Sequence, residues 1–383
     1  MARLSDVCNI QAGGTPSRSY VEYWKDGNIP WVKISDIKGK KLYITEEKIT
    51  ELGLEKSSAK LFPKGTILYS IFATLGEVAI LDIDATTNQA IAGLQLIDDS
   101  VLPDYLYYFL VSKKDFVNNI GRGVAQNNIN LKILRDMAIT IPSKKEQKDI
   151  ILRLNTINQS IEWRKQQLSK LDELVKARFV ELFGDPVINE KGWETKSLLE
   201  MGYCKNGMNF RYGDTGIEVN CLGVGDFKDY SIISDTSVLP KVSLNEMPSD
   251  DYMLKDNDIV FVRSNGNKAL VGRSVVVYPG KVPTTFSGFC IRYRKTDEVV
   301  NVPYLVRVLK TESIRKKMAG RGANIQNLNQ QILGTLIIPV PPIELQNEFA
   351  TFVQQVDKSK FEVQQSLEKL ETLKKSLMQQ YFG

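Results

Sequence analysis

The chemistry open to this chain is limited first by the residue types that it lacks. Its 383 residues include no histidine, which excludes Ser-His-Asp and Cys-His nucleophiles, H-E-x-x-H zinc sites and imidazole acid–base catalysis. No G-x-x-x-x-G-K-S/T phosphate loop, G-x-G-x-x-G fingerprint or D/N-P-P-F/Y signature occurs. Pro103-Asp104 could open a P-D…E-x-K nuclease motif, but no E-x-K follows at a suitable distance. The sequence therefore predicts a protein that catalyses no reaction alone.

The cysteines do not form a recognisable site either. They stand alone, with no C-x-x-C pair: Cys8, Cys204, Cys221 and Cys290. Neither a zinc knuckle nor a disulfide framework is indicated. The N-terminus lacks the plan of a signal peptide, and no apolar run reaches the ~18 residues of a membrane span. We expect a soluble protein of a reducing cytoplasm.

Side chains that form hydrogen bonds without catalysing gather on several loops. These loops are Gly13–Arg18, Asn88-Gln89, Gln126–Asn128 and Arg263–Lys268. Arginine, asparagine, glutamine, serine and lysine on loops suit base edges and phosphates. The same composition is typical of ordinary turns, so both interpretations stay open for any single loop.

The distribution of charge argues against a simple duplex-binding protein. The chain carries a net charge of +5, yet residues 1–142 hold 16 basic and 16 acidic side chains, and residues 185–341 hold 20 and 17. Dedicated duplex binders carry a clearer basic excess. One basic cluster comprises Arg307, Lys310, Arg315, Lys316, Lys317 and Arg321, and a solvated helix face explains it nearly as well. If the protein holds DNA tightly, a partner must supply much of the phosphate contact.

The elements that position these loops are duplicated. Residues 121–184 and 320–383 align without a gap at a constant offset of 199. Matched positions include Gly121/Gly320, Arg122/Arg321, Asn128/Asn327, Asn130/Asn329, Pro142/Pro341, Gln147/Gln346 and the closing Phe-Gly. The segments before them agree only loosely. The chain therefore consists of a variable domain and a repeated segment, followed by a second pair of the same kind.

Each repeated segment predicts one long helix. Apolar residues recur at a spacing of 3.5 in both copies, which is typical of a coiled coil. The positions are Ile150, Leu154, Ile157, Ile161, Arg164, Leu168, Leu171, Val175, Arg178 and Leu182, and then Phe349, Val353, Val356, Lys360, Val363, Leu367, Leu370, Lys374, Leu377 and Tyr381. Each helix would be roughly 60 Å long. Two separate helices, each packed on its own domain, are the alternative.

Chain connectivity predicts how the two helices run. The second variable domain joins the end of the first helix to the start of the second, and a compact domain of ~155 residues is much shorter than such a helix. The helices should therefore be antiparallel, with the domains at opposite ends and the C-terminus near Met1. The predicted segments are 1–142, 143–184, 185–341 and 342–383.

The variable domains are predicted to be rich in strands. Short β-type runs bounded by turns occur at 66–72, 77–80 and 93–96, and again at 258–262 and 274–278. One short helical segment follows in each domain, at about 103–119 and 303–318. The predicted fold class is α+β: two α/β globular domains related by a pseudo-two-fold axis and separated by a pair of long antiparallel coiled-coil helices.

This ordered set of motifs, present twice, resembles the specificity (S) subunit of type I restriction-modification systems. The residues that carry the resemblance are Gly121–Asn130 with Ile141-Pro142 and Glu146-Gln147, then Gly320–Asn329 with Ile338-Pro339 and Leu345-Gln346. Ile29–Val32, Thr74–Gly76, Asn88-Gln89 and Arg263–Gly266 also match. Two departures are Leu345, where the family shows glutamate, and Ser70–Phe72, which lacks the arginine often found near that strand.

The resemblance implies a concrete function. Each variable domain would be a target recognition domain that reads one half of an asymmetric bipartite DNA site. The helices would set the spacing between the halves and bind two methyltransferase (M) subunits. Those subunits would bring S-adenosylmethionine, and ATP-driven restriction (R) subunits would translocate and cleave DNA. The chain itself would need no cofactor and would not be an enzyme.

We expect eleven side chains to face DNA: Arg18, Lys33, Arg122, Gln126 and Asn128 in one half, and Arg263, Asn265, Asn267, Lys268, Arg321 and Gln326 in the other. For Arg122 and Arg321, a structural bridge to the base of the helix is an equal alternative. Two other functions stay open: a scaffold whose two heads bind proteins, and a recognition module of a methyltransferase complex without R subunits.

Overall fold

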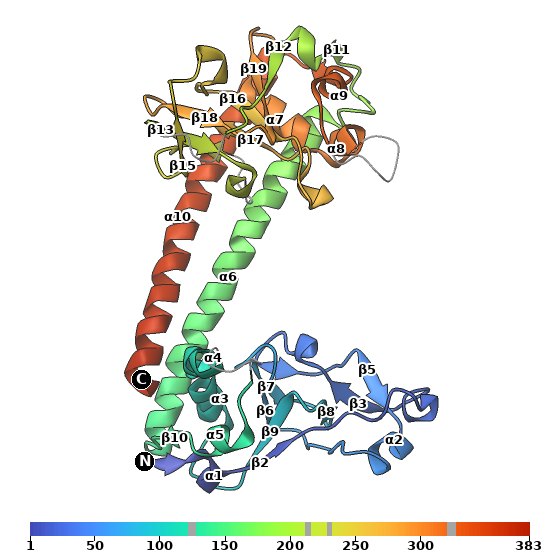
Figure 1. The fold of residues 1–383 in the computed structure, drawn as a ribbon, viewed down its shortest axis with the longest axis vertical. Coiled ribbons are helices and arrows are strands. Elements are labelled where there is room, and N and C mark those ends of the chain that lie inside the picture. The colour runs from blue at the N-terminus through green and yellow to red at the C-terminus, as the bar shows by residue number, and fades with distance from the viewer. Residues whose placement is uncertain (122–127, 211–215, 228–231, 320–326) are drawn as a thin grey trace. The chain divides into compact units, whose positions relative to one another are not determined.

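The computed structural model describes residues 1–121, 128–210, 216–227, 232–319 and 327–383. These residues fold into two compact units, Met1–Lys165 with Gln365–Gly383 and Gln166–Gln364 (Figure 1). The two units are defined by which residues pack together, so both long helices contribute to each unit. The four predicted segments are defined by the sequence repeat instead, and their boundaries stay predictions.

The first unit contains two mixed sheets and a two-stranded ribbon. The five-stranded sheet has the order β2 (Cys8–Ala12), β9 (Ile91–Leu96), β6 (Ile67–Ser70), β7 (Val78–Leu81) and β4 (Lys41–Leu42). The three-stranded sheet has the order β5 (Glu47–Ile49), β3 (Ile29–Val32) and β8 (Thr86–Thr87). Strand β1 (Ala2–Arg3) pairs with β10 (Ala138–Ile139). The short helices are α1 (Leu4–Val7), α2 (Glu51–Glu55), α3 (Pro103–Ser112), α4 (Lys114–Gly121) and α5 (Leu131–Arg135).

The second unit repeats this topology strand for strand. Its larger sheet has the order β12 (Gly202–Asn206), β19 (Cys290–Lys295), β16 (Asp258–Val262), β17 (Ser274–Val277) and β14 (Ile232–Ile233). The smaller sheet has the order β15 (Lys241–Leu244), β13 (Ile217–Leu222) and β18 (Thr284–Phe286), and the ribbon pairs β11 (Glu194–Ser197) with β20 (Ile337–Val340). Helices α7 (Val302–Lys310), α8 (Glu312–Ala319) and α9 (Gln330–Gly334) complete it. The predicted pair of α/β domains is confirmed.

The two long helices have equal length and opposite direction. Helix α6 covers Lys144–Phe183 and α10 covers Ile343–Phe382. In the second unit, Arg178 pairs with Glu348 at 2.6 Å and Asp172 pairs with Lys360 at 2.7 Å. Partner numbers rise as α6 numbers fall, so the helices are antiparallel, as predicted. Every predicted heptad position is buried or half-buried. Among the described residues, no helix combines the length and apolarity that a membrane span requires.

A buried glutamine attaches the start of each long helix to its own domain. In the first unit, Gln147 accepts a hydrogen bond from the backbone N–H of Leu102 at 2.9 Å and donates to the carbonyl oxygens of Ser100 and Pro142. In the second unit, Gln346 makes the same three bonds at equivalent positions, the first with the N–H of Asn301 at 2.8 Å. Both side chains are fully buried. The glutamine near the start of each long helix is therefore a structural anchor.

The far end of each long helix is buried in the core of the other domain. Phe183 of α6 packs edge-to-face against Tyr304 with ring centroids 4.7 Å apart, in a cluster that includes Phe179 and Phe349. Phe382 of α10 packs against Tyr105 at 5.3 Å and shares a core with Leu4. Aromatic pairs of this kind add packing energy beyond the area that they bury. The C-terminus lies in the same unit as the N-terminus, as predicted (Figure 1).

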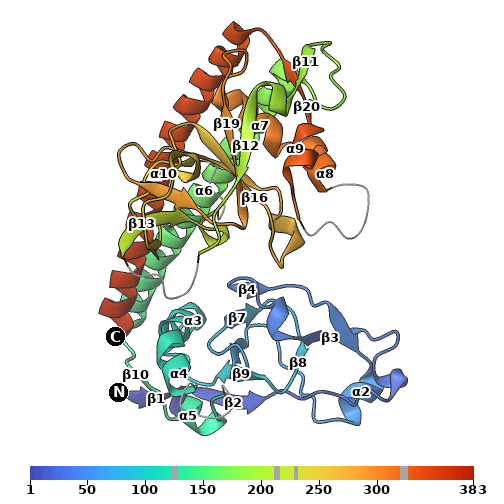
Figure 2. The same cartoon turned by 45° about the horizontal axis from the view of Figure 1, so that its top comes forward.

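The helical segment expected in each variable domain is two helices rather than one. Helix α3 ends before Lys113 and α4 begins at Lys114, while Thr311 separates α7 from α8 with extended backbone (φ −64°, ψ 147°). The hydroxyls of Ser112 and Thr311 donate to the carbonyls of Phe109 and Val308. These local bonds compete with helix continuation. Figure 2 shows α3 between the five-stranded sheet and α6 in the first unit, where the Tyr108 hydroxyl donates to Asn155 of α6 at 2.6 Å.

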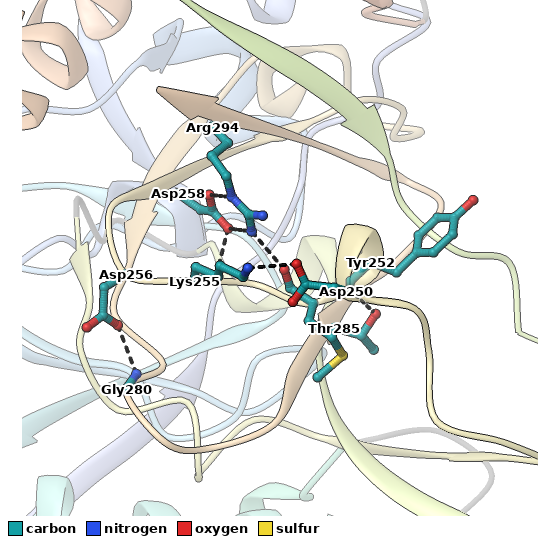
Figure 3. A network of polar contacts seen from close by, with 9 residues as sticks. Asp250, Tyr252, Lys255, Asp256, Asp258, Gly280, Thr285 and Arg294 are labelled. Atoms are coloured by element: carbon teal, nitrogen blue, oxygen red, sulfur yellow. Dashed lines mark hydrogen bonds and ion pairs between the residues drawn. The ribbon is translucent and has the colours of Figure 1, made fainter. Parts of the chain in front are cut away.

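The start of β16 is held by a polar network around Arg294 and Asp258. Arg294 of β19 makes a two-bond ion pair with Asp258 at 2.8 and 2.7 Å and also donates to the Met253 carbonyl (Figure 3). The Asp258 carboxylate also accepts from the Lys255 backbone, and Lys255 in turn pairs with Asp250 at 2.7 Å. Because Asp258 is buried, the paired guanidinium compensates its charge.

Candidate nucleic-acid interface

The structure brings two of the predicted side chains of the first unit together. Arg18 and Lys33 both pair with Glu47, at 2.5 and 2.8 Å. Lys33 also pairs with Glu46 at 2.7 Å. The guanidinium of Arg18 lies over the Trp24 ring, 3.6 Å from its centroid. Stacking on Trp24 and pairing with Glu47 together orient the Arg18 side chain, which is still 54% exposed. An arginine must be both oriented and exposed to read a base edge.

The electrostatics of this cluster favour the charged forms of Lys33 and Glu47. Hydrogen bonds to Glu46 and then Glu47 raise the pKa of Lys33 above its ordinary value. The hydrogen bond from Arg18, reinforced by Lys33, lowers the pKa of the Glu47 carboxyl. The carboxylates offset the cations, so the cluster provides oriented donors rather than a simple positive patch.

The loop that carries Arg18 is fixed by close backbone contacts. The N–H groups of Gly13 and Gly14 donate to the carbonyls of Ile91 and Thr87 at 3.0 and 2.9 Å. A Cβ atom at Gly13 would collide with the Thr87 hydroxyl and carbonyl, so only glycine fits this approach. The Trp31 indole donates to the Gly14 carbonyl at 3.1 Å. The two glycines therefore fix the position of the loop tip that carries Arg18.

Asn128 lies in a different part of the first unit. It forms an isolated antiparallel bridge with Phe72, and the next residue, Ile129, donates its N–H to the Ile71 carbonyl at 3.0 Å. Within the part of the chain that the structure describes, no hydrogen bond or ion pair joins Asn128 to Arg18 or Lys33. The loop after β6 therefore forms a second edge of the first unit, and Asn128 lies at this edge.

In the second unit the equivalent edge carries Arg263. Its carbonyl accepts from the Leu328 N–H at 2.8 Å, as Ile71 accepts from Ile129 in the first unit. The Arg263 guanidinium donates to the Gly288 carbonyl at 3.2 Å, which leaves further N–H groups for a ligand. Arginine thus occupies a position where the first domain has isoleucine, in agreement with the departure noted at Ser70–Phe72.

The loop after Arg263 uses its asparagines partly for its own fold. The Asn265 side-chain oxygen accepts from the Asn267 N–H at 2.7 Å, and the Asn267 oxygen accepts from the Ala269 N–H at 3.1 Å. These bonds are turn chemistry, so only the NH₂ groups remain to donate to a base. Lys268 begins a short 3₁₀ helix, Lys268–Leu270. The other four predicted residues, Arg122, Gln126, Arg321 and Gln326, lie outside the described residues.

Sequence reasoning missed the residues that position these donors. Trp24 supports the Arg18 guanidinium and Glu47 bridges Arg18 to Lys33. Phe289 is exposed, and its carbonyl accepts from the Arg263 N–H at 2.8 Å. No local pattern signals these roles, because each contact joins residues that are distant in the chain. Within the described ranges, no group of three or more Cys, Asp or Glu side chains is arranged to hold a metal ion.

Several relatives resemble this chain over most of its length. The MjaIX type I restriction enzyme specificity subunit of Methanocaldococcus jannaschii is 27% identical over 376 residues, covering 92% of this chain and 85% of that protein. The StySPI type I restriction enzyme specificity subunit of Salmonella potsdam is 24% identical over 415 residues, covering 100% of this chain and 88% of the relative.

Solved structures support the same fold. One solved chain comes from work on complex assembly and conformational transition of the type I R-M system. It superposes with a TM-score of 0.63 at 18% identity, and the match covers 100% of this chain. The S subunit from M. genitalium gives 0.55 at 17% identity, with 100% of this chain and 95% of that chain covered. The family model for the type I restriction modification DNA specificity domain matches residues 1–173 and again residues 190–374. Because this match spans nearly the whole chain in two copies, the protein belongs to the type I restriction modification DNA specificity domain family.

Proposed function

We propose that this chain is the non-catalytic recognition subunit of a type I restriction-modification complex and that it reads an asymmetric, bipartite DNA site. One observation carries the proposal: two domains with the same strand order present different donors at equivalent positions. Lys33 of the first domain corresponds to Gly223 of the second, since each backbone N–H donates to an aspartate three residues later at 2.8 Å. Ile71 corresponds to Arg263. Different donors on one frame read different half-sites.

The partners proposed for the complex are two M subunits, R subunits and double-stranded DNA. The long helices support the first of these. Leu174 and Leu373, which are related by the repeat offset, are 48% and 47% exposed. Exposed leucines at matched helix positions suit two copies of one partner. S-adenosylmethionine would be bound by the M subunits and ATP by the R subunits, in the cytoplasm.

The eleven predicted residues remain the proposed DNA contacts, and Arg18 is the one that the structure supports best. In a complex of this chain with its M subunit, Arg18→Gln should weaken binding to the cognate duplex by ~1–3 kcal/mol and relax one base position. Fluorescence anisotropy against a set of single-base variants measures both effects. Arg3→Gln, which changes an exposed arginine that pairs with Asp136 at 3.6 Å, is the matched control.

The result separates three outcomes. A selective loss at one base position assigns Arg18 to base reading. Uniform weakening over all sequences assigns it to a phosphate. Unchanged affinity and unchanged base preference, equal to those of Arg3→Gln, would remove the Arg18 loop from the DNA interface.

A further inference from the structure

An exposed phenylalanine lies beside the polar loops of each unit. In the first unit it is Phe72, which follows β6 and is 43% exposed. In the second unit it is Phe289, which precedes β19 and is 61% exposed. A single exposed apolar side chain is ordinary on a protein surface. The places that these two rings take in the shared frame are not ordinary.

Phe289 stands where the first unit has a small residue. Its carbonyl oxygen accepts from the Arg263 N–H at 2.8 Å, and in the first unit the Ala90 carbonyl accepts from the Ile71 N–H at 2.8 Å. The backbone bond is the same in both units, so the alanine shows that the fold does not require a ring at this position.

Phe72 shows the reverse exchange. It forms an isolated antiparallel bridge with Asn128, and Ser264 forms the same bridge with Asn327 in the second unit. The two asparagines are also matched by the repeat offset of 199. Serine therefore stands in the second unit where the first has a ring. Each edge carries a phenylalanine, but the two rings come from different loops of the frame.

A tight turn holds Phe289 in place at the surface. The Ser287 hydroxyl accepts from the Phe289 N–H at 3.3 Å. The Gly288 N–H donates to the Met208 carbonyl at 2.6 Å, and a Cβ atom at Gly288 would collide with the Asn209 side chain. A ring that is already held in position loses little conformational entropy when it contacts a ligand.

Hydrogen-bond donors accompany the ring in the second unit. The Arg263 guanidinium donates to the carbonyl of Gly288, the residue before Phe289, at 3.2 Å. One turn therefore positions both a guanidinium and an exposed ring.

The first unit has a similar combination. The N–H of Gly14, in the loop that carries Arg18, donates to the carbonyl of Thr87 at the end of β8 at 2.9 Å. The loop that carries Phe72 is bonded to Ala90, just before β9. The arginine loop and the phenylalanine loop are thus both attached to the segment that links β8 to β9.

An arginine beside a phenylalanine matches the chemistry of the DNA major groove. Guanine presents two acceptors that suit a guanidinium, and thymine presents a 5-methyl group that suits an apolar side chain. We propose that Phe289 and Phe72 each contact the 5-methyl group of a thymine, one in each half-site. This inference rests on the proposed DNA-reading function and adds the base that each ring recognises.

The experiment removes the methyl group from the DNA and the ring from the protein. The probe is the duplex that carries the motif methylated by this chain with its M subunit, with each thymine replaced in turn by deoxyuridine. This change removes the 5-methyl group and keeps the Watson–Crick edge. In fluorescence anisotropy with the complex of both subunits, one such replacement in each half should weaken binding about fourfold, because one buried methyl group is lost.

Two reciprocal variants are each other's control. Phe289→Ala should abolish the difference between thymine and deoxyuridine in one half-site and leave the difference in the other half unchanged. Phe72→Ala should do the opposite. Both substitutions keep the backbone bonds of the exposed residue, and both variants should assemble with the M subunit as the unchanged chain does in size-exclusion chromatography.

Three results would overturn the inference while the proposed function stands. The first is specific binding that no deoxyuridine replacement weakens. The second is a difference between thymine and deoxyuridine that persists in both variants. The third is loss of assembly with the M subunit in either variant, which would make that ring a protein contact. Equal binding of the methylated motif and of an unrelated duplex would instead reject the proposed function, and this inference with it.

Discussion

At the scale of single residues, the same side chain serves different purposes in the two halves of the chain. Gln147 and Gln346 keep one role, since each makes the same three buried hydrogen bonds. Lys33 and Arg263 have no counterpart of their own type. Residues that build the frame are thus retained across the duplication, whereas residues on the polar loops differ.

The glutamine anchors predict a large and local cost of substitution. Gln147→Leu leaves the Leu102 N–H and the carbonyls of Ser100 and Pro142 without their partner, so it should destabilise the first unit by about 2–4 kcal/mol. Chemical denaturation measures this value. Gln159→Leu, at an exposed position of the same helix, should change stability by less than about 0.5 kcal/mol. Equal effects of the two substitutions would show that the buried bonds are not needed.

Lys310 predicts a pH dependence of stability with a definite sign. Its folded-state pKa of about 8 lies below the ordinary 10.5, so its charge costs stability below about pH 8, and that cost falls as pH rises from about 8 to 10.5. Burial is the main cause of this lowered pKa, and the charged groups that act on Lys310 are Arg307, Lys360, Asp172 and Arg273. Lys310→Met should therefore raise the thermal midpoint at neutral pH, and the gain should shrink toward pH 10. A gain that does not vary with pH, as measured by scanning calorimetry, would contradict this account.

At the scale of elements, each long helix joins two compact units. It begins on a buried glutamine in one domain and ends on a buried phenylalanine in the core of the other unit. Hydrophobic burial at that end, rather than helix propensity, fixes the position of each 40-residue helix. The backbone carbonyl at each end is also capped: Lys113 donates to that of Phe382 at 2.5 Å and Trp193 to that of Phe183 at 3.3 Å.

The two phenylalanines predict separable effects. Phe382→Ala should destabilise the first unit and Phe183→Ala the second, each by about 3–5 kcal/mol, because a large ring is removed from a closed core. Hydrogen–deuterium exchange localises the loss of protection, which should concentrate in the unit that contains the substitution. Phe361→Ala, at an exposed position of α10, is the control. Equal loss of protection in both units from either change would show that the cores are not independent.

Much of the fold could be predicted from the sequence because the repeat is strong. The offset of 199 and the 3.5-residue spacing are sufficient to give two long helices, and short apolar runs locate strands such as β16 (Asp258–Val262). The interruption at Lys113 and Thr311 could not be predicted, since hydroxyl-to-carbonyl bonds compete with helix formation there only in the folded context. The same limit applies to the site. Arg18 was identified from its loop, but its stacking on Trp24 and its shared carboxylate with Lys33 depend on tertiary contacts.

At the scale of the whole molecule, the chain contains one fold twice, and the hydrogen-bond donors on the loops differ between the two copies. The strand orders agree in all three pairs of sheets. Among the described residues, the Arg294–Asp258 pair and the Arg263 loop lie in the second unit, whereas the Arg18–Lys33–Glu47 cluster lies in the first. Duplication of a frame with divergent loops is expected to give two recognition surfaces whose targets differ. This arrangement would be the physical basis for the proposed asymmetric recognition site.

The most direct test of that claim is a map of methylated adenines in the genome of a host that expresses this chain together with its M subunit. Methylation is expected at a single asymmetric motif of two unlike half-sequences separated by a fixed number of unspecified bases. Arg18→Gln should relax one half of that motif and leave the other unchanged. A continuous motif, a palindrome, or methylation without sequence preference would contradict it.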